Sequence, residues 1–527
     1  MANKRLFGTN TALLAPPADA VNEAGGRAYA LSPRHALAQY AATGCLNATF
    51  YASAEQQLAT LLALCEQVTP EFIAKTAVYC RERGLMKDVP ALLCAVLAVR
   101  DTRLLAQIFP RVIDDARMLR NFVQILRSGQ LGRRSLGTAP KRLVREWLAA
   151  RTEEQLSRAA VGRDPSLADI VKMVHPRPAT PAREALYAYL IGKAGGEAMA
   201  LLPEAVQRFE SFKGARAAGE NAAEPPDVPF QMLTALNLST ADWTAIARRA
   251  TWQQVRLNLN TFARHGVFEV EGMAELVAAK LSDEQAIARA RVFPYQLLAA
   301  YQAAGPEIPV GVRHALHAAM EVATRNVPAL SGKVYILLDV SGSMSAPVSG
   351  WRKGATTKTR CIDAAALIAA AILRTNPRAE VIAFNGSAVE VALHAELPVM
   401  ANAERLAALL GGGTNCSAPL ALLNQRQAEA DLVIFVSDME SWMDRWGRGY
   451  AGATGTMHEW QALKARNPRA RLACIDLQAY ATTQAQERAD VLNVGGFSDQ
   501  VFELLGLFAR GELTAEHWIG VIEAVEL

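Results

Sequence analysis

Oxygen-bearing side chains follow one apolar run of the sequence at alternate positions. Residues 334–338 are apolar, and Asp339, Ser341 and Ser343 come directly after them. One carboxylate and two hydroxyls are hard oxygen ligands of the kind that small divalent cations prefer. Open parallel sheets gather their ligands at the carboxyl ends of the strands. The spacing therefore predicts a metal site just beyond the end of a buried strand.

Two further loops offer oxygen ligands of the same kind. Thr414 follows three consecutive glycines at residues 411–413, and Asp438 closely follows the apolar run 432–436. Asp, Ser and Gly also cluster in ordinary turns, so Asp-x-Ser-x-Ser alone does not establish a metal site. Three such loops within one alternating pattern of strands and helices favour the metal site over a chance turn.

The same residues do not suit a nucleophilic enzyme. An α/β serine hydrolase carries Gly-x-Ser-x-Gly and a histidine partner, whereas residues 342–346 read Gly-Ser-Met-Ser-Ala. A phosphoaspartyl mechanism would want a second acid two residues after Asp339, where Ser341 stands. No histidine adjoins any of the three loops. We therefore expect a binding site and not an enzyme.

The elements that must position these loops alternate between strands and helices after residue 330. Short apolar strands separated by helices predict a mostly parallel, doubly wound sheet. Strands are expected at residues 333–338, 379–384, 388–393, 432–437, 471–477 and 491–494. Helices are expected at residues 361–374, 402–410, 419–426, 458–465 and 499–508.

Residues 20 to 330 have the pattern of one helix after another. Ser53 with Gln56 predicts a capping box, and Thr69 before Pro70 predicts a capped first turn. Repeated helix pairs without strands fit an α-solenoid, in which neighbouring pairs bury a continuous core. A polar loop is expected at residues 214–229. Helices are expected at residues 91–99, 103–113, 117–127, 141–150, 167–174, 240–249, 252–264, 270–280, 283–290, 294–303 and 310–325.

The bulk composition fits a compact chain of two or more domains. The chain has 527 residues, of which 51% are hydrophobic and 20% charged, so a single core is not expected. Its seven cysteines are scattered and form no Cys-x-x-Cys pair, which favours reduced thiols over a disulfide frame or a zinc site. No stretch has the roughly 18 apolar residues that cross a bilayer. We expect a cytoplasmic protein without a membrane role.

Positive charge is concentrated in one part of the chain. Residues 100–193 hold 18 Lys or Arg against 9 Asp or Glu, a net charge of +9, although the whole chain carries only +4. Such an excess favours a polyanion partner. Cations near helix ends and in the loop 129–138 could reach phosphates. The candidate RNA-binding residues are Arg127, Arg133, Arg134, Lys141, Arg142, Arg145, Lys172, His175 and Arg177.

Each of these cations also has a structural interpretation. Lys141 and Arg145 could pair with Glu146 or Glu153 on exposed helix faces. His175 stands before Pro176 at an expected helix end, where a cap or a contact with the helix dipole competes with an RNA contact. Both interpretations stay open on the sequence alone.

The three oxygen-bearing loops resemble the metal-ion-dependent adhesion site of the von Willebrand factor A fold. The resemblance implies that Ser341, Ser343 and Thr414 coordinate a divalent cation such as Mg²⁺, with Asp339 and Asp438 binding directly or through water. It also implies an open coordination position for a carboxylate of a partner. The chain has Met-Glu after the second aspartate, where many members of that family have Gly-Glu.

The helical part resembles the TROVE domain of the Ro autoantigen family. The resemblance rests on residues 22–32, 43–51, 167–176 and 256–264 and extends over residues 20–525. It implies an α + α/β protein in two parts. A ring of HEAT-like helical repeats would span residues 20–330, and a doubly wound von Willebrand factor A domain would span residues 331–527.

The family resemblance also implies a function. Its members bind small non-coding Y RNAs on the outer surface of the ring and single-stranded ends of misfolded or structured RNAs through the hole. Bacterial relatives act with an exoribonuclease, polynucleotide phosphorylase, in RNA decay or maturation. We therefore expect a monomeric scaffold for RNA quality control. The alternative is a metal-dependent protein-interaction scaffold without an RNA role.

Overall fold

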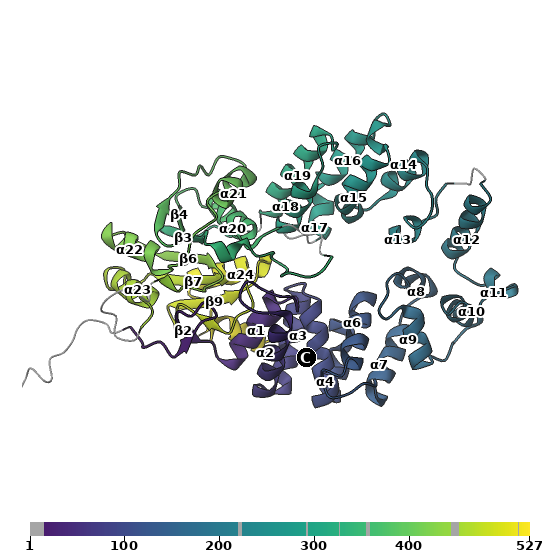
Figure 1. The fold of residues 1–527 in the computed structure, drawn as a ribbon, viewed down its shortest axis with the longest axis horizontal. Helices are drawn as coiled ribbons and strands as arrows, with labels where there is room; N and C mark the ends of the chain where they lie inside the picture. The colour runs from purple at the N-terminus through teal and green to yellow at the C-terminus, as the bar shows by residue number, and fades with distance from the viewer. Residues whose placement is uncertain are drawn as a thin grey trace, which may run out of the picture. The chain divides into compact units, whose positions relative to one another are not determined.

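The structure is a computed structural model that describes residues 15–219, 224–290, 294–325, 327–354, 359–443, 453–514 and 516–527. The chain divides into two compact units, whose elements are labelled in Figure 1. The sheet unit holds residues up to Gln67 together with Thr324–Ala524. The helical unit holds Val68–Ala323 and Val525–Leu527.

The helical unit is a succession of short helices that pack on near neighbours in the chain. Contacts join α3 to α4 and α5, α4 to α6, α5 to α7, and α16 to α19, as expected for stacked helical repeats. The helices are α3 (Pro70–Glu82), α4 (Asp88–Arg100), α5 (Thr102–Val112), α6 (Ala116–Arg127), α7 (Thr138–Ala149), α8 (Glu153–Ala159), α9 (Leu167–Val174), α10 (Pro181–Leu190), α11 (Glu197–Ala200), α12 (Glu204–Ala217), α13 (Phe230–Leu233), α14 (Thr240–Arg249), α15 (Trp252–Arg264), η2 (Val267–Glu269), α16 (Met273–Leu281), α17 (Glu284–Ala290), α18 (Pro294–Ala303) and α19 (Val310–Ala323).

Local sequence signals explain where several of these helices begin. The Thr69 hydroxyl accepts a hydrogen bond from the Phe72 amide at 3.2 Å, which confirms the predicted cap of α3. The predicted bounds of α9, α14, α15 and α18 are also confirmed. The expected loop at 214–229 was wrong at its start, because α12 continues to Ala217. Arg216, the polar side chain of this stretch, is half-buried and forms an ion pair with the buried Asp242 at 2.6 Å.

The sheet unit is built on a six-stranded sheet with the order β5-β4-β3-β6-β7-β9. The neighbours from β4 to β9 pair in parallel, and only β5 is antiparallel, which confirms the mostly parallel prediction. The strands are β3 (Val334–Asp339), β4 (Glu380–Phe384), β5 (Ala388–Glu390), β6 (Leu432–Ser437), β7 (Arg471–Asp476) and β9 (Val491–Gly495).

Helices cover both faces of this sheet, so every residue of β3 and β6 is buried. On one face, Leu337 and Phe435 pack in a hydrophobic cluster with Leu420 of α22 and Trp460 of α23. Contacts of α20 with β3, β4 and β6 bury apolar side chains of the sheet as well. After β3, the helices of this unit are η3 (Gly342–Ser345), α20 (Cys361–Thr375), α21 (Val399–Ala407), α22 (Ser417–Gln425), α23 (Gly455–Arg466), α24 (Asp499–Arg510) and α25 (His517–Glu523).

The N-terminal segment belongs to the sheet unit, which differs from the domain expected to span residues 20–330. Its strands β1 (Ala20–Val21) and β2 (Arg27–Ala30) form a small antiparallel sheet with β8 (Thr482–Thr483). Its helix α1 (Pro33–Thr43) contacts β9 and α25, and α2 (Ala54–Gln67) follows. Backbone pairing with residues more than 400 positions away fixes this segment, and two-residue strands leave no periodicity in the sequence.

Side chains of the N-terminal segment strengthen the same attachment. The amide of Gln39 donates to the carbonyl of Gln478 at 2.8 Å, and the amide of Gln57 donates to the carbonyl of Ala479 at 3.0 Å. Both glutamines are almost fully buried. Since buried amides are costly unless they are hydrogen-bonded, these bonds specify where α1 and α2 dock.

The structure also bears on the cysteines and on membrane-spanning helices. All seven cysteines are free, and six of them are buried, which confirms the reduced-thiol prediction. Within the described ranges, no helix combines the length and the apolar character that crossing a bilayer requires.

Substituting Gly26 tests the attachment of the N-terminal segment. A Cβ at this position would lie 1.9 Å from the Ser441 carbonyl oxygen and 2.9 Å from the Trp442 Cα. Both are backbone atoms, so Gly26→Ala should lower the free energy of unfolding by about 1–3 kcal/mol. Urea denaturation would measure this change.

Gly214→Ala in α12 is the control, because a Cβ there meets nothing within 4 Å. It should be neutral or stabilising by up to about 1 kcal/mol, since alanine favours a helix over glycine. Equal effects of the two substitutions would show that the turn at Gly26 is not tightly docked.

Candidate metal centre and nucleic-acid interface

Adjacent parallel strands bring the two predicted aspartates to one edge of the sheet. Leu338 of β3 is paired with Val436 of β6, so Asp339 and Asp438 follow at neighbouring strand ends. The Ser437 hydroxyl donates to Asp339 Oδ2 at 2.6 Å. Both aspartates are buried, with exposed fractions of 0% and 1%. The paired strands therefore hold two carboxyl groups inside the protein.

Asp339 also organises the loop that carries the two serines. Its Oδ1 accepts a hydrogen bond from the Ser341 amide at 2.8 Å. The hydroxyl oxygens of Ser341 and Ser343 then lie 3.1 Å apart. Both serines are buried, so the alternating pattern of the sequence becomes a compact group of oxygen atoms.

The glycine-rich loop lies directly against this group. The Gly342 amide donates to the Gly412 carbonyl at 2.9 Å, and the Gly411 amide donates to the Val340 carbonyl at 2.8 Å. Thr414, which ends the loop, is 1% exposed, and its carbonyl accepts from the Trp442 amide at 3.1 Å. The structure thus brings together the three loops that carry the five predicted metal ligands.

The electrostatics of this cluster favour a bound cation. Burial raises the pKa of Asp339, and the nearby Asp438 carboxyl raises it further. Burial likewise raises the pKa of Asp438, and burial with the charge of Asp438 raises the pKa of Glu440 and of Asp476. Four buried carboxyl groups therefore share one region, where the charge of Asp438 disfavours ionisation of the other three.

Two oxygens of this cluster lack a hydrogen-bond partner among the residues that the structure describes: Asp438 Oδ2 and Glu440 Oε1. Unpartnered buried oxygens are costly, and a divalent cation would satisfy them. Within the described part of the chain, no three His, Cys, Asp or Glu side chains are grouped to hold a metal. A cation here would depend on the serine and threonine hydroxyls, as the predicted ligand set requires.

The departure from the family pattern after Asp438 has a backbone consequence. Met439 adopts a φ of +56°, in the left-handed region that favours glycine. Its amide donates to the Ser437 hydroxyl at 2.9 Å, and its side chain is buried. The loop therefore has a backbone conformation that glycine adopts without strain. Methionine is strained in this conformation, and its side chain is packed in the protein interior.

Three of the candidate RNA-binding residues line one cavity of the helical unit. Arg145, His175 and Arg177 border a space of about 510 Å³ together with Arg183 and Tyr187. All three candidates are exposed. His175 has a left-handed backbone at the end of α9, and its amide donates to the Val171 carbonyl. The backbone therefore caps the helix while the imidazole remains accessible.

Some of the other candidate side chains are exposed, and others form hydrogen bonds or ion pairs within the protein. Arg127 and Lys172 are exposed, and both lower the pKa of Asp169 after the larger effect of its hydrogen bonds to Ser166. These two cations thus lie near one another. Arg134 is exposed and Lys141 is half-buried, and neither forms an ion pair with any residue that the structure describes.

Three candidates donate hydrogen bonds within the protein, and one of them is Arg145, whose Nε donates to the Val174 carbonyl at 2.6 Å. Arg142 forms an ion pair with Glu146 at 2.8 Å on an exposed helix face. The Arg133 guanidinium donates to the backbone carbonyls of Ser135, Leu136 and Ala98. Because these bonds shape the loop before α7, Arg133 has a structural role that its sequence position did not reveal.

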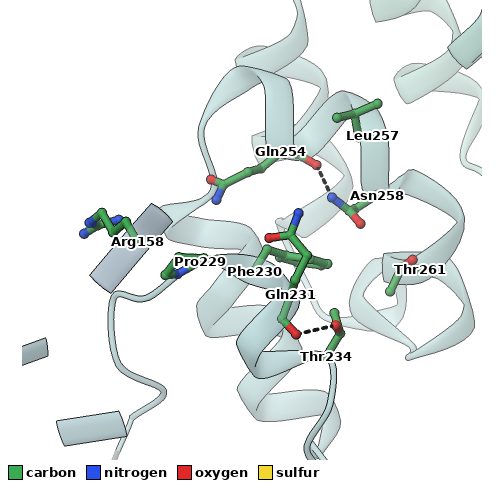
Figure 2. Close-up of a pocket in the computed structure, with 9 residues that line it drawn as sticks. All are labelled: Arg158, Pro229, Phe230, Gln231, Thr234, Gln254, Leu257, Asn258 and Thr261. Carbon is green, nitrogen blue, oxygen red and sulfur yellow. Dashed lines mark hydrogen bonds between the residues drawn. The ribbon is translucent and has the colours of Figure 1, made fainter. Parts of the chain in front are cut away.

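A second cavity was not anticipated from the sequence. Figure 2 shows residues of α13 and α15 around a space of about 570 Å³. Phe230 and Gln231 come from α13, while Asn258 marks a non-helical kink inside α15. The amide of Asn258 donates to the Gln254 carbonyl at 2.8 Å. In the sequence, residues 256–264 show only a resemblance to the TROVE domain and no sign of a cavity.

Comparisons with known proteins agree with this arrangement. Residues 333–509 match the family model of the Ro60 von Willebrand factor A domain. The chain is 24% identical to a Deinococcus radiodurans protein named RNA-binding protein RO60, over 93% of this chain and 95% of the relative. It is 23% identical to a Caenorhabditis elegans protein of the same name, over 46% of this chain and 38% of the relative.

A solved structure shares the fold. The crystal structure of the Deinococcus radiodurans Ro (RSR) protein superposes with a TM-score of 0.59 at 20% sequence identity. It covers 92% of this chain, and all of that chain is matched. The resemblance to the Ro family is therefore confirmed: the chain carries a von Willebrand factor A domain of the Ro60 type and is similar to a bacterial Ro protein over nearly its whole length.

Proposed function

We propose that the chain binds RNA through the basic surface of its helical unit. The observation that carries this proposal is the group of exposed basic side chains on or just after α6, α7 and α9, of which Arg145, His175 and Arg177 line one cavity. Two relatives bear the name RNA-binding protein RO60, which supports the same function. We infer a binding role without catalysis.

The chemistry of this surface suits contacts to the RNA backbone. Arginine offers a planar fork of donors that matches a phosphate. Arg177 and Arg145 are exposed and line the cavity, although Arg145 already donates its Nε to the Val174 carbonyl at 2.6 Å. Arg183, which lies deeper, donates to the carbonyls of Leu148 and Arg151 and pairs with Glu153. Its role is to hold the end of α7 in place.

The RNA class follows from the same chemistry. Cations without exposed aromatic partners favour recognition of shape and of flexible ends over base stacking. We propose that the ligands are small structured RNAs of the Y type and single-stranded ends of other RNAs. The family resemblance supports a ring-shaped monomer in the cytoplasm that presents RNA to an exoribonuclease such as polynucleotide phosphorylase.

A second role concerns the metal centre. We propose that Ser341, Ser343 and Thr414 hold a divalent cation, for which Mg²⁺ is the best match to hard oxygen ligands. Asp339 and Asp438 would hold it directly or through water. The unpartnered Asp438 oxygen and the buried carboxyl cluster support this assignment. The cation would supply local charge compensation and a position for an anionic group.

Salt dependence tests the electrostatic mode of RNA binding. If about 6 to 10 phosphates are neutralised, the affinity should fall by roughly 10³ to 10⁵ between 50 and 200 mM salt. Gel shifts of a small structured RNA with a free 3′ end, run across a salt series, would measure this slope. Binding that is absent or independent of salt would contradict the proposal.

Charge reversal tests the location of the RNA surface. The triple variant Arg134→Glu, Lys172→Glu and Arg177→Glu should weaken RNA binding at least about 100-fold and reduce the salt slope by about 3, because each phosphate contact contributes about one unit of slope. All three side chains are exposed, so the melting temperature should stay unchanged.

The matched control is Arg208→Glu, Arg248→Glu and Arg289→Glu, which changes the net charge equally at exposed positions elsewhere in the helical unit. It should bind RNA within about threefold of the unmodified chain. Equal weakening by both variants would mean that only the overall charge matters and would refute the assigned surface.

Mg²⁺ titration tests the metal centre. At 100 times its dissociation constant, Mg²⁺ should stabilise the chain by about 2.7 kcal/mol, measured as a rise in melting temperature over an EDTA sample. Asp438→Asn should remove most of this rise. Glu404→Gln, an exposed position of α21, should leave it intact. A rise that persists in Asp438→Asn would place the cation elsewhere.

A further inference from the structure

Two exposed aromatic side chains of the sheet unit lie next to each other. Phe50 and Trp351 are each 44% exposed, and no other Phe, Tyr or Trp among the described residues is exposed. They come from distant parts of the chain, yet their ring centroids are 6.2 Å apart and their planes are inclined by 44°. Exposed apolar residues are normally scattered, so an adjacent pair indicates a binding surface. We call this pair the aromatic platform.

Backbone contacts fix the two segments that carry the platform. The Trp351 amide donates to the Ala48 carbonyl at 2.7 Å, and the side-chain amide of Asn47 donates to the Ser349 carbonyl at 2.7 Å. Gly350 has a φ of +69°, and a Cβ there would lie 2.6 Å from the Ala48 oxygen. The segments therefore lie tightly against each other and set the positions of both rings.

The Phe50 ring is also supported from the protein interior. Its centroid lies 4.8 Å from the Tyr51 ring, edge to face. The Tyr51 ring in turn lies 6.1 Å from the ring of Tyr480, which is fully buried. Since the rings are held in place before a ligand arrives, binding requires little further ordering of side chains.

The charges beside the platform are all positive. Arg352 and Lys353 directly follow Trp351 and are exposed, and neither is ion-paired with a residue that the structure describes. Residues 45–54 and 346–354, which carry the two rings, include no Asp or Glu. Cations beside exposed aromatic faces complement a ligand that has negative charge and flat rings. Single-stranded nucleic acid is such a ligand, because its bases stack on aromatic side chains while cations contact its backbone.

We propose that the aromatic platform binds unpaired bases of single-stranded RNA and that Arg352 and Lys353 contact the adjoining phosphates. This inference rests on the proposal that RNA is the ligand, and it adds a second surface with a different chemistry. The helical unit offers cations without exposed aromatic rings, whereas the platform contacts the faces of bases. Because the ring planes are inclined by 44°, one base cannot lie flat on both, so each ring stacks on its own base.

A protein partner is the competing occupant, since aromatic residues and arginine are enriched at protein interfaces. The two unpaired cations and the absence of acidic residues in residues 45–54 and 346–354 favour a polyanion. The basic excess of residues 100–193 independently indicates a ligand of the same charge. A polyanion whose recognition depends on its bases is therefore the occupant to test.

Two probes of equal charge separate base stacking from phosphate contact on the full chain. One is a fluorescent oligoadenylate of about ten nucleotides, within the length that single-strand binding sites cover. The other is an abasic ribose-phosphate chain of the same length. Fluorescence anisotropy at low salt measures both affinities. The unmodified chain should bind the oligoadenylate at least about fivefold more tightly, because stacking requires a base.

Substitutions of the rings locate the stacking. Trp351→Ala should weaken oligoadenylate binding about 5- to 100-fold, the effect of losing one stacked base, and change the affinity for the abasic probe less than about twofold. Trp351→Phe keeps a ring and should restore most of the loss. Phe50→Leu removes the other ring and should weaken oligoadenylate binding in the same direction. The control is Val389→Ala, an exposed apolar position of β5, which should leave both affinities unchanged.

Substitution of the cations should act on both probes. The double variant Arg352→Ser and Lys353→Ser should weaken the two probes by a similar factor and reduce the salt slope by about 1 to 2, because each cation neutralises a phosphate. A loss confined to the oligoadenylate would contradict the assigned phosphate contacts.

The outcomes overturn or support the inference separately from the proposed function. Equal loss of both probes in Trp351→Ala would overturn it, because the ring would then support only the fold. No loss of oligoadenylate binding would also overturn it and would leave the platform to a protein partner. Absence of binding of both probes to the unmodified chain would overturn it as well. If Trp351→Ala fails to fold, Phe50→Leu decides.

The charge-reversal variant of the helical unit distinguishes the two proposals. Arg134→Glu, Lys172→Glu and Arg177→Glu should weaken binding of structured RNA and preserve the difference between the two probes that depends on Trp351. If the unmodified chain binds no structured RNA but shows that difference, the proposed function fails and the platform stands. If it binds structured RNA without the difference, the platform alone is refuted.

Discussion

The burial of carboxyl groups at the carboxyl edge of the parallel sheet is the constraint on which the sheet unit depends. Asp339 and Asp438 end neighbouring strands and cannot reach water, so the surrounding loops must supply donors. The Ser437 hydroxyl and the Ser341 amide do so for Asp339. These bonds fix the directions in which two loops leave the sheet, and the third loop follows through its backbone contacts with them.

The N-terminal segment completes this arrangement. Its turn at residues 22–26 gives Glu440 a backbone donor, and the Tyr51 amide donates to the Tyr480 hydroxyl at 3.4 Å. A region that reads as the start of a helical repeat thus contributes to the environment of a site almost 300 residues further along the chain. The sheet unit is therefore discontinuous in sequence.

In the helical unit, the same residue type serves two purposes. The guanidinium groups of Arg183 and Arg133 donate hydrogen bonds to backbone carbonyls and so stabilise the ends of neighbouring elements. Arg134, Lys172 and Arg177 remain exposed and can meet phosphates. An arginine that is buried and donates its N–H groups within the protein stabilises the fold. An arginine that is exposed keeps its N–H groups for RNA.

The sequence by itself determined the alternation of strands and helices after residue 330, the helix caps such as Thr69, and the oxygen-bearing side chains that follow the strands, at Asp339, Ser341, Ser343, Thr414 and Asp438. Those features depend on local periodicity and on side chains adjacent to strand ends. Only the tertiary structure decided that residues 20–67 join the sheet unit, that the Arg133 guanidinium donates to backbone carbonyls, and that Glu440 and Asp476 are buried near Asp438. The reason is physical: these contacts join residues that are far apart along the chain, and their energies come from pairing and desolvation that no local pattern records.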